Sequence, residues 1–543
     1  MKYFLITSLF CITILSPHNL FSQNLTSQTG SWGDQGNGTY INPVLNADYS
    51  DPDIVRVGDD FYMVCSEFHF MGMPVLHSKD LVNWTIISQV YKEFKFAPEF
   101  DTNERYAGGS WAPAIRYHDN KFWVYFCTPD EGLFMSTAEK AEGPWAPLHQ
   151  VADTAGWEDP CPFWDDDGQA YLGRSKVGAG PIIIHKMSSD GKELLDDGFT
   201  VYTGPVAEGT KIHKLNDYYY LSIPEGGVAQ GWQTVVRSKN IFGPYEKKVV
   251  LETGSTKING PHQGSLIELP NGDWWFMHFQ SDFTIGRVVH LQPMFWKDDW
   301  PEIGVDIDRN GIGEPVYTWK KPDVGEVYPI TAPQTSDEFS ESEPGLQWAW
   351  NHNPVNEAWS LTEKSGFLSL TSLPASTIKE ARNTLTQKIM GSDGEATTLL
   401  ITNEMTDGQK AGLCLIGRQY NQIGIVNDNG KLSVFTDIEG KVTKKRIKAS
   451  RIYLQVKIVK PEIELREPSE NERRRFPSIQ PSHQFYYSTN NKDFVPLGEK
   501  FTATFGNWKG PKIGLYSYHE NGNGGTALFD WFRYIYDGPK YSH

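Results

Sequence analysis

The chain has 543 residues, of which 39% are hydrophobic and 13% aromatic, and its formal net charge at pH 7 is −17. A chain of this length is expected to form about two to four domains. The negative charge argues against a nucleic-acid partner, because the phosphate backbone would be repelled, whereas a neutral glycan meets no such barrier. The aromatic content suits half-buried strands and also stacking against sugar rings.

The first 23 residues have the pattern of a secretory signal peptide. Lys2 precedes an apolar run from Tyr3 to Leu15, and polar residues follow. We therefore interpret residues 1–23 as a cleaved signal and the protein as secreted or periplasmic. The run is too short for a membrane span, and no other stretch is long enough, so no membrane span is expected. The four later cysteines lack the spacing of a zinc site or a disulfide framework, which favours buried free thiols, with one bridge among the first three as the alternative.

A short pattern repeats five times in the first half of the chain: a polar turn, then alternating aromatic and aliphatic residues. The aromatic anchors of the five copies are Phe61, Phe122, Tyr171, Tyr219 and Trp275. The turns contain Asp, Asn and Gly, which suit hairpins. Intervals of about 50 residues with several strands each are typical of propeller blades. We therefore predict a five-bladed β-propeller over residues 39–326, an arrangement that leaves no long exposed sheet edge.

The pattern changes beyond the predicted propeller. Residues 327–336 contain Pro and polar residues without periodicity, which indicates a linker. From residue 337 to residue 543, short β-branched and aromatic segments alternate with turns, as in an antiparallel β-sandwich. No long amphipathic helix pattern is present, so the predicted fold class is all-β. Residues 466–483 are charged and contain Pro, which favours a solvated loop, with a partner site as the alternative.

Three acidic residues stand out beside the predicted inner strands. Asp51 and Asp159 each precede a proline, and this recurrence suggests equivalent positions facing one cavity, with two turn-forming dipeptides as the alternative. The following proline favours an extended backbone at Asp51. Glu208 comes before the fourth aromatic phrase, next to Gly209, and Glu225 in a Gly-rich turn is its rival. Paired carboxyl groups can serve as acid and base across a sugar bond, so the pattern favours glycoside hydrolysis.

The motifs taken together resemble glycoside hydrolase family 43. The segments that carry the resemblance include NPVLNADYSDPDIV, EDPCPFWDDDGQAYL, AEGTKIHKLNDYYYL, INGPHQGSLIEL and GRVVHLQPM. The resemblance covers residues from about Asn42 to Lys321. It implies a five-bladed propeller and inverting hydrolysis of arabinose- and xylose-containing glycans. The chain departs from many members at Thr210, where they have Pro, which changes backbone stiffness beside Glu208 but removes no required group.

The resemblance implies a role for each of the three acids. By position in the motifs, Asp51 corresponds to the general base and Glu208 to the general acid, and Asp159 to the carboxylate that orients the acid and tunes its pKa. Glu208 must be protonated to act, so its pKa is expected to be raised by the charge of Asp159. Inversion needs room for a water molecule, so the carboxyl groups of Asp51 and Glu208 are expected to lie about 6.5–9.5 Å apart.

The same motifs imply three substrate-binding residues. Arg287 corresponds to a contact to the sugar at the cleavage subsite, and Trp111 to a wall of the sugar pocket. His262 corresponds to a histidine near the propeller axis that holds water or a calcium ion. The structural alternatives are a salt bridge for Arg287, a core histidine for His262 and blade packing for Trp111.

Two calcium sites are considered. The segment DIDRNGIGE, residues 306–314, alternates oxygen ligands like a calcium loop, but Tyr317 stands where that loop needs a bidentate Glu, so a plain acidic turn is the alternative. The second half resembles the concanavalin-like jelly-roll module that often follows family 43 propellers. This implies a structural calcium ion between its terminal strands, with Glu338 and Asp530 as candidate ligands. No cofactor is required for the hydrolysis itself.

The sequence as a whole therefore favours a secreted, exo-acting, inverting glycosidase. Its expected products are xylose or arabinofuranose, released from plant cell-wall polysaccharide of the arabinoxylan type or from its oligosaccharides. The alternatives are an endo-arabinanase, which needs an open groove, and a non-catalytic glycan-binding propeller. Retention of all three acids argues against the last alternative, because binding alone does not need an acid of tuned pKa.

Overall fold

The computed structural model describes residues 33–68, 72–102, 105, 107–258, 260–282, 285–459, 481–503, 505–506 and 508–536. The predicted signal segment and residues 466–480 of the predicted insertion lie outside these described residues. Within them the regular secondary structure is almost entirely β-strand, and the helical turns are the short 3-10 helices η2 (Pro98–Asp101), η3 (Asn356–Ala358) and η4 (Ile378–Glu380). The all-β prediction is therefore confirmed. In the same residues, no helix combines the length and apolar character that a membrane crossing needs.

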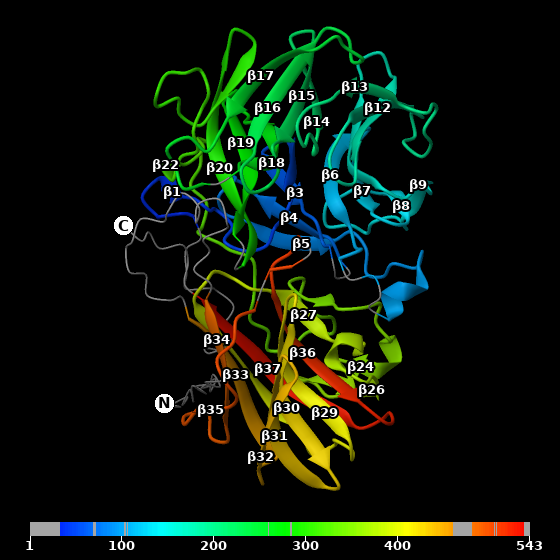
Figure 1. The fold of residues 1–543 in the computed structure, drawn as a ribbon, viewed down its shortest axis with the longest axis vertical. Helices are drawn as coiled ribbons and strands as arrows, with labels where there is room; N and C mark the ends of the chain where they lie inside the picture. Colours follow the sequence, from blue (N-terminus) through cyan, green and yellow to red (C-terminus); the bar gives the residue numbers. More distant parts are fainter. Residues whose placement is uncertain are drawn as a thin grey trace, which may run out of the picture.

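Five four-stranded antiparallel sheets form the first half of the structure, which occupies the upper part of Figure 1. The first sheet contains β2 (Asp53–Val57), β3 (Asp60–Val64), β4 (Pro74–Ser78) and β5 (Thr85–Gln89). The second contains β6 (Trp111–His118), β7 (Lys121–Thr128), β8 (Gly132–Ala138) and β9 (His149–Ala152). The third contains β10 (Trp157–Trp164), β11 (Ala170–Lys176), β12 (Ile182–Met187) and β13 (Phe199–Tyr202). The fourth contains β14 (Lys211–Leu215), β15 (Tyr218–Glu225), β16 (Trp232–Ser238) and β17 (Glu246–Leu251). The fifth contains β18 (His262–Glu268), β19 (Trp274–Asp282), β20 (Gly286–Lys297) and β21 (Trp300–Ile303).

These sheets are the blades of a closed β-propeller, as the five repeats predict. Strand β18 of the last blade packs against β2 of the first, which closes the ring. The five aromatic anchors all lie on the second strand of their blades, β3, β7, β11, β15 and β19. The repeat was recognisable because most side chains of this strand are buried, which favours apolar and aromatic residues. A short sheet of β1 (Thr39–Ile41) and β22 (Thr318–Lys320) joins the two ends of the propeller segment.

A buried polar network ties the five innermost strands together. Asp53 on β2 accepts a hydrogen bond from Arg116 Nη1 at 2.6 Å and another from Ser265 Oγ at 2.6 Å. The second Arg116 nitrogen lies 2.9 Å from the Cys161 sulfur on β10, and Lys211 Nζ on β14 lies 3.8 Å from Asp53. Each blade thus contributes one of these five side chains. Charges that are paired and hydrogen-bonded in this way fix the relative positions of the strands that carry them.

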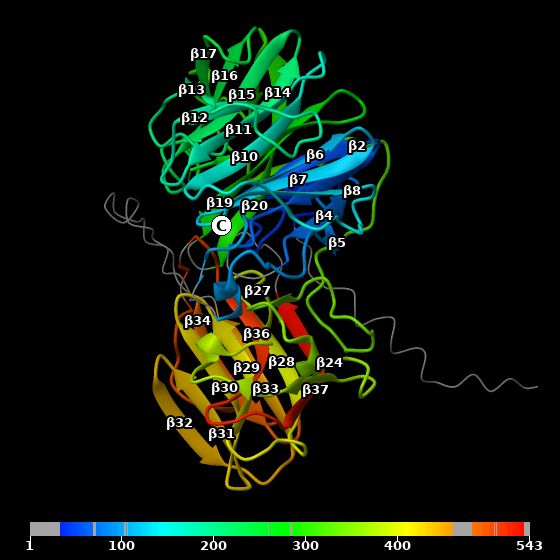
Figure 2. The same cartoon turned by 90° about the vertical axis from the view of Figure 1, so that its right-hand side faces the viewer.

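The second half of the structure is a sandwich of two sheets, antiparallel except for the short strand β26, in the lower part of Figures 1 and 2. One sheet contains β23 (Ala349–Trp350), β26 (Leu373–Pro374), β27 (Leu385–Lys388), β29 (Gln409–Ile416), β30 (Tyr420–Asp428), β31 (Lys431–Ile438), β32 (Lys441–Arg446) and β36 (Lys512–His519). The other contains β24 (Trp359–Ser360), β25 (Leu368–Thr371), β28 (Gly394–Ile401), β33 (Arg451–Val459), β34 (Ser482–Ser488), β35 (Val495–Pro496) and β37 (Thr526–Tyr536).

The predicted β-sandwich is confirmed, although some of its edge strands carry no sequence signal. Strand β32 is mostly exposed and reads KVTKKR, so its residues lack the apolar alternation from which strands are predicted. Residues 327–336, expected to be a linker, form neither helix nor strand. Cys65, Cys127, Cys161 and Cys414 are all buried free thiols, as favoured.

The sandwich is joined to the propeller by buried polar contacts. Glu67, which follows β3, pairs with Lys388 Nζ at 3.0 Å and with Lys512, and both lysines belong to the sandwich. Asp48, just ahead of the first blade, accepts hydrogen bonds from the backbone N–H groups of Arg287 and Gly510, each at 2.8 Å. Gly510 belongs to the sandwich loop that precedes β36. This loop therefore reaches the propeller residues that surround Arg287.

Candidate active site

The start of each innermost strand contains one residue with a left-handed backbone. These residues are Asp51 (φ 54°), Ala112 (φ 38°), Asp159 (φ 58°), Gly209 (φ 61°) and Gln263 (φ 36°). In β6, β10 and β18 the register with the next strand also shifts at this point. Such a bulge breaks the alternation of side chains between the two faces of a strand, so adjacent side chains can turn to one side. All five blades share the left-handed residue and three of them share the bulge, and functional groups gather at this end of the propeller.

The backbone at Asp51 differs from expectation. The following proline predicted an extended conformation, but φ is positive. Asp tolerates the left-handed region better than most residues, at a cost of about 1–3 kcal/mol that the surroundings must offset. Three donors do so: Ser50 Oγ at 2.8 Å and Ser66 Oγ at 2.5 Å to Oδ2, and Arg287 Nη1 at 2.9 Å to Oδ1. The Asp51 carboxylate is buried and held in one orientation.

Asp159 is held from two other blades. Its Oδ2 accepts hydrogen bonds from Ser175 Oγ at 2.9 Å and from the backbone N–H of Gly209 at 2.7 Å, and its Oδ1 accepts one from Gln263 Nε2 at 2.8 Å. Gly209 is required here, because a Cβ atom at its position would lie 2.3 Å from Gln263 Cγ. Burial raises the pKa of Asp159, and the negative charge of Glu208 raises it further, against the opposing hydrogen bond from Gly209.

Glu208 lies beside Asp159 and contacts His262. Its Oε1 forms a hydrogen bond with His262 Nε2 at 2.7 Å, and its side chain keeps 20% of its surface exposed, which makes it the accessible carboxylate of the group. Burial alone would raise the pKa of Glu208, but the His262 hydrogen bond and charge, with the charge of Arg287, bring it below its usual value. The expected rise in the Glu208 pKa is therefore absent, because the His262 contact is the stronger influence.

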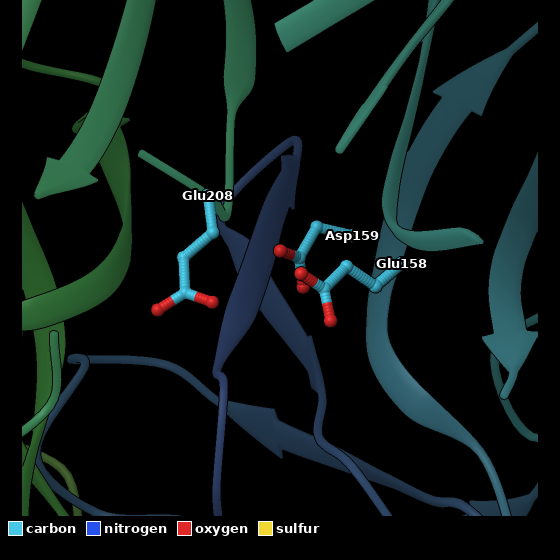
Figure 3. A group of neighbouring side chains, drawn as sticks. All are labelled: Glu158, Asp159 and Glu208. Atoms are coloured by element: carbon cyan, nitrogen blue, oxygen red, sulfur yellow. The ribbon is translucent and has the colours of Figure 1, made fainter. Parts of the chain in front are cut away.

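A fourth acid, Glu158, completes the group, and the sequence analysis missed it. Single carboxylate oxygens of Glu158, Asp159 and Glu208 all lie within 4.8 Å of one another. Figure 3 shows Glu158 and Asp159 leaving the same strand toward Glu208. A regular strand would place Glu158 on the face opposite to Asp159, which is why the WEDP motif did not suggest it. In the described part of the chain, this trio is the one group of three Asp, Glu, His or Cys side chains whose polar atoms approach one another this closely.

Aromatic rings surround the Arg287 guanidinium. Phe279 lies 4.6 Å from it, Phe68 5.4 Å and Trp508 5.7 Å, measured to the ring centroids. Trp111, predicted as a pocket wall, packs edge-on against Phe68 at 5.6 Å, which places it in the same wall. Trp508 comes from the sandwich and is 48% exposed, so a ring is available on that side. No local pattern in the sequence connects Trp508 with the propeller motifs.

The structure thus brings the three predicted acids and the three predicted binding residues into one connected site. Asp51 contacts Arg287, Arg287 lies above Phe279, and Phe279 packs against His262 at 5.5 Å. His262 in turn contacts Glu208. The arrangement offers a buried carboxylate paired with a guanidinium and, across the site, a partly exposed acid beside other carboxyl groups. Such a pair can activate water on one side of a sugar and protonate an oxygen on the other.

The rival acid Glu225 has a different environment. It ends β15 and is fully buried, where it accepts hydrogen bonds from Tyr202, Trp232 and Thr234 and pairs with Lys247 at 2.7 Å. The sequence analysis placed Glu225 in a Gly-rich turn, but it is the last residue of a strand and is shielded from solvent. Glu225 therefore balances the charge of Lys247 within the third and fourth blades, which is a structural role.

The candidate calcium ligands have other partners. Glu338 forms two hydrogen bonds with the guanidinium of Arg533, at 2.8 and 3.1 Å, and Asp530 lies 3.6 Å from Arg451. The acidic turn at 306–314 is closed by hydrogen bonds from the backbone of Asn310 and Gly311 to the Asp306 carboxylate, each at 3.0 Å. Calcium in the sandwich stays a prediction, which a calcium titration followed by the melting temperature would check.

Comparisons with known proteins agree with this geometry. The model of "Glycosyl hydrolases family 43" matches residues 40–301, and that of the "Beta xylosidase C-terminal Concanavalin A-like domain" matches residues 336–535. A "Putative beta-xylosidase" of Xylanibacter ruminicola is 52% identical over 488 residues, which cover 90% of this chain and 88% of that protein. A "Beta-xylosidase" of Formosa agariphila is 39% identical and covers 95% of this chain and 93% of its own length. The crystal structure of the GH43 BlXynB protein from Bacillus licheniformis superimposes with a TM-score of 0.77 at 26% identity, over 92% of this chain and 100% of that one.

Proposed function

Since the chain belongs to glycosyl hydrolases family 43 and is a glycosidase, we propose that it is an inverting, exo-acting xylosidase. Its proposed substrates are arabinoxylan-type plant cell-wall polysaccharides and their oligosaccharides. The observation that carries this proposal is the gathering of Asp51, Asp159 and Glu208, from three different blades, around one buried site beside Arg287. Xylose is favoured over arabinofuranose as the product because the two relatives with the highest identity given above are named as xylosidases.

In the proposed reaction, Asp51 is the general base. Its carboxylate accepts hydrogen bonds from two serines and from Arg287, and these donors hold it in one orientation. It takes a proton from a water molecule that attacks the anomeric carbon from the side opposite to the leaving group. Because no residue forms a bond with the sugar, attack from the opposite side inverts the anomeric configuration.

Glu208 is the proposed general acid. It delivers its proton to the glycosidic oxygen as the bond to the anomeric carbon breaks, and the departing sugar leaves as an alcohol. Its greater exposure relative to Asp159 supports contact with the leaving group. In the free protein, burial raises the pKa of Glu208, but the His262 hydrogen bond outweighs burial and the pKa is lowered. The proton needed for catalysis must therefore be retained by the neighbouring carboxyl groups. Asp159, held by three donors, orients this pair.

The sandwich supports the exo mode of action. Trp508 reaches from the sandwich to the surroundings of Arg287, and Asp48 ties the same loop to the propeller. A wall on that side suits a pocket that accepts one terminal sugar, whereas an endo-arabinanase needs a groove open at both ends. The expected early products from a xylo-oligosaccharide are xylose and the oligosaccharide that is one unit shorter, in equal amounts, whereas an endo-acting enzyme would release fragments of several lengths at once.

Two measurements test the proposal. Release of nitrophenol from paired xylopyranoside and arabinofuranoside substrates identifies the sugar, and xylopyranoside is expected to be the better substrate. Proton NMR during the first minutes of hydrolysis of a β-xyloside should show α-xylose first; β-xylose appearing first would refute inversion. If neither substrate is hydrolysed and a Glu208→Ala variant binds xylan as well as the wild type, the chain is a glycan-binding propeller instead.

Export of the protein is also proposed. Residues 1–23 have the order of a basic residue, an apolar run and a polar stretch that signal peptidases recognise. Expression of the whole chain in a bacterium with a periplasm should yield a mature protein that begins near residue 23. N-terminal sequencing of the cytoplasmic and exported fractions decides this, because an unprocessed chain found in the cytoplasm alone would contradict it.

A further inference from the structure

We propose that Glu158 is a positioning residue of the active site, which shares one proton with Asp159 and Glu208 and thereby extends hydrolysis toward alkaline pH. The inference rests on the proposed hydrolysis and adds a fourth acidic group to it. Neither the motif positions nor the general acid–base scheme requires a carboxyl group at this position. The contacts of Glu158 with the other acids support this assignment.

The backbone of β10 places Glu158 in the site. Asp159 has a left-handed φ of 58°, and the register with β11 shifts between Glu158 and Cys161. This bulge turns two consecutive side chains to the same side, where a regular strand would separate them. A non-glycine residue in this conformation costs about 1–3 kcal/mol and persists only where other contacts hold it. The hydrogen bonds to Asp159 supply those contacts, and the strained backbone brings Glu158 with it (Figure 3).

Glu158 and Asp159 differ in how well their charges are solvated. Asp159 accepts three hydrogen bonds between 2.7 and 2.9 Å. Glu158 accepts longer ones, from the Ala179 N–H at 3.2 Å and from Ser175 Oγ at 3.5 Å. Both carboxyl groups are buried, with at most 6% of either residue exposed. Since a buried carboxylate with few short donors is costly to ionise, a proton shared between the two belongs mainly to Glu158.

The charged neighbours of Glu158 increase this preference. Asp159 on its own strand and Glu208 from the segment before β14 are both acidic, and the Cys127 thiol faces the pair from β7. On β11, the Arg174 guanidinium lies over the Trp157 ring at 3.7 Å and Lys176 is paired with Trp157 in the strand register, and in the described residues no Lys, Arg or His forms an ion pair with Glu158. Burial therefore raises the pKa of Glu158, and the charges of Asp159 and Glu208 raise it further.

A shared proton has a defined effect on catalysis. Carboxyl groups this close titrate together rather than independently. The last proton is the hardest to remove, because its loss adds a negative charge beside carboxylates that are already ionised. Each turnover needs that proton on Glu208. After Glu208 has protonated the leaving oxygen, the exchange of a proton from the Glu158 carboxyl to the Glu208 carboxylate restores the acid, and solvent reprotonates Glu158. With three acids instead of two, the last proton is retained to higher pH.

The test is the pH dependence of kcat/KM and of kcat for xylobiose, whose sugar leaving group requires protonation. Glu158→Gln keeps the size of the side chain but leaves only two acids, so the alkaline limb should move to lower pH by about 1–3 units, with little change on the acidic side. Glu158→Asp retains a carboxyl group and should preserve the alkaline limb. Glu246→Gln, an exposed change on β17, is the matched control and should leave the whole profile unchanged.

Three outcomes are distinguishable. The inference is supported if the alkaline limb shifts in Glu158→Gln but stays in place in Glu158→Asp. A superimposable profile, or an equal loss of rate at every pH, overturns it, because the residue then has no role or a purely structural one. Wild-type protein that hydrolyses no xyloside would instead refute the proposed function. The melting temperature of each variant shows that it is folded, and the infrared band of protonated carboxyl groups, measured at pH 7, should be smaller in Glu158→Gln than in wild type.

Discussion

The assignment of Glu208 as the acid can be tested by comparing two leaving groups. Glu208→Gln removes the transferable proton but keeps the length of the side chain, and the amide can still contact His262, which lies 2.7 Å from the native carboxylate. The change is therefore expected to affect proton donation more than folding. A sugar hydroxyl is a poor leaving group and needs the proton, whereas nitrophenolate departs without it.

The expected magnitude follows from these leaving groups. General acid catalysis contributes a factor of about 10²–10⁴, which corresponds to about 2.7–5.4 kcal/mol of transition-state stabilisation. Glu208→Gln should lose about this factor in kcat on xylobiose, and less than about tenfold on nitrophenyl xyloside. Asp51→Asn is the matched control, because the base activates water in both reactions. Its loss should be similar for the two substrates.

The assay compares the loss of kcat on xylobiose with the loss of kcat on nitrophenyl xyloside, for each variant relative to wild type at one pH. Release of xylose is measured for xylobiose and release of nitrophenol for the other substrate. Equal losses on both substrates in Glu208→Gln would refute the assignment of Glu208 as the acid. If Glu158→Gln showed the leaving-group dependence instead, then Glu158 would be the proton donor.

Three further predictions concern the junction between propeller and sandwich. Glu67 is the counter-charge of two buried lysines, so Glu67→Gln should lower the free energy of unfolding by about 3–5 kcal/mol, and Glu343→Gln, in an exposed pair, by less than about 1 kcal/mol; equal effects in denaturant titrations would contradict this. Burial raises the pKa of Glu67, but the charges of Lys388 and Lys512 hold it below the usual 4.5. The stabilisation by the ionised carboxylate is therefore complete above pH 4.5 and is lost as the pH falls through the lower pKa of the folded state. Acid-unfolding curves of wild type and Glu67→Gln should show this difference. Asp48 holds the N–H groups of Arg287 and of the Trp508 loop, so Asp48→Ala and Trp508→Ala should be coupled in kcat/KM by about 0.5–3 kcal/mol in a double-mutant cycle; additive effects would show that the loop acts independently.

Much of the fold could be predicted because it repeats. The five anchors mark the second strand of each blade, where burial on both faces constrains residue type most strongly. The sandwich strands with alternating apolar residues were found in the same way, and the exposed strand β32 was not. Motif position brought Asp51, Asp159 and Glu208 together as candidates, and they share one site in the structure.

The sequence by itself thus determined the architecture, which depends on residue type at regular spacing, and its motifs named Asp51, Asp159 and Glu208 as the candidate acids. Tertiary structure alone decided which neighbours complete the site. Glu158 faces it because the backbone at Asp159 is left-handed, and no residue type at that position requires this conformation. The loop that carries Trp508 meets Asp48 through the Gly510 N–H, a contact between segments hundreds of residues apart about which local periodicity carries no information. The pKa of Glu208 likewise depends on the distance to His262, which only the packing of one blade against the next sets.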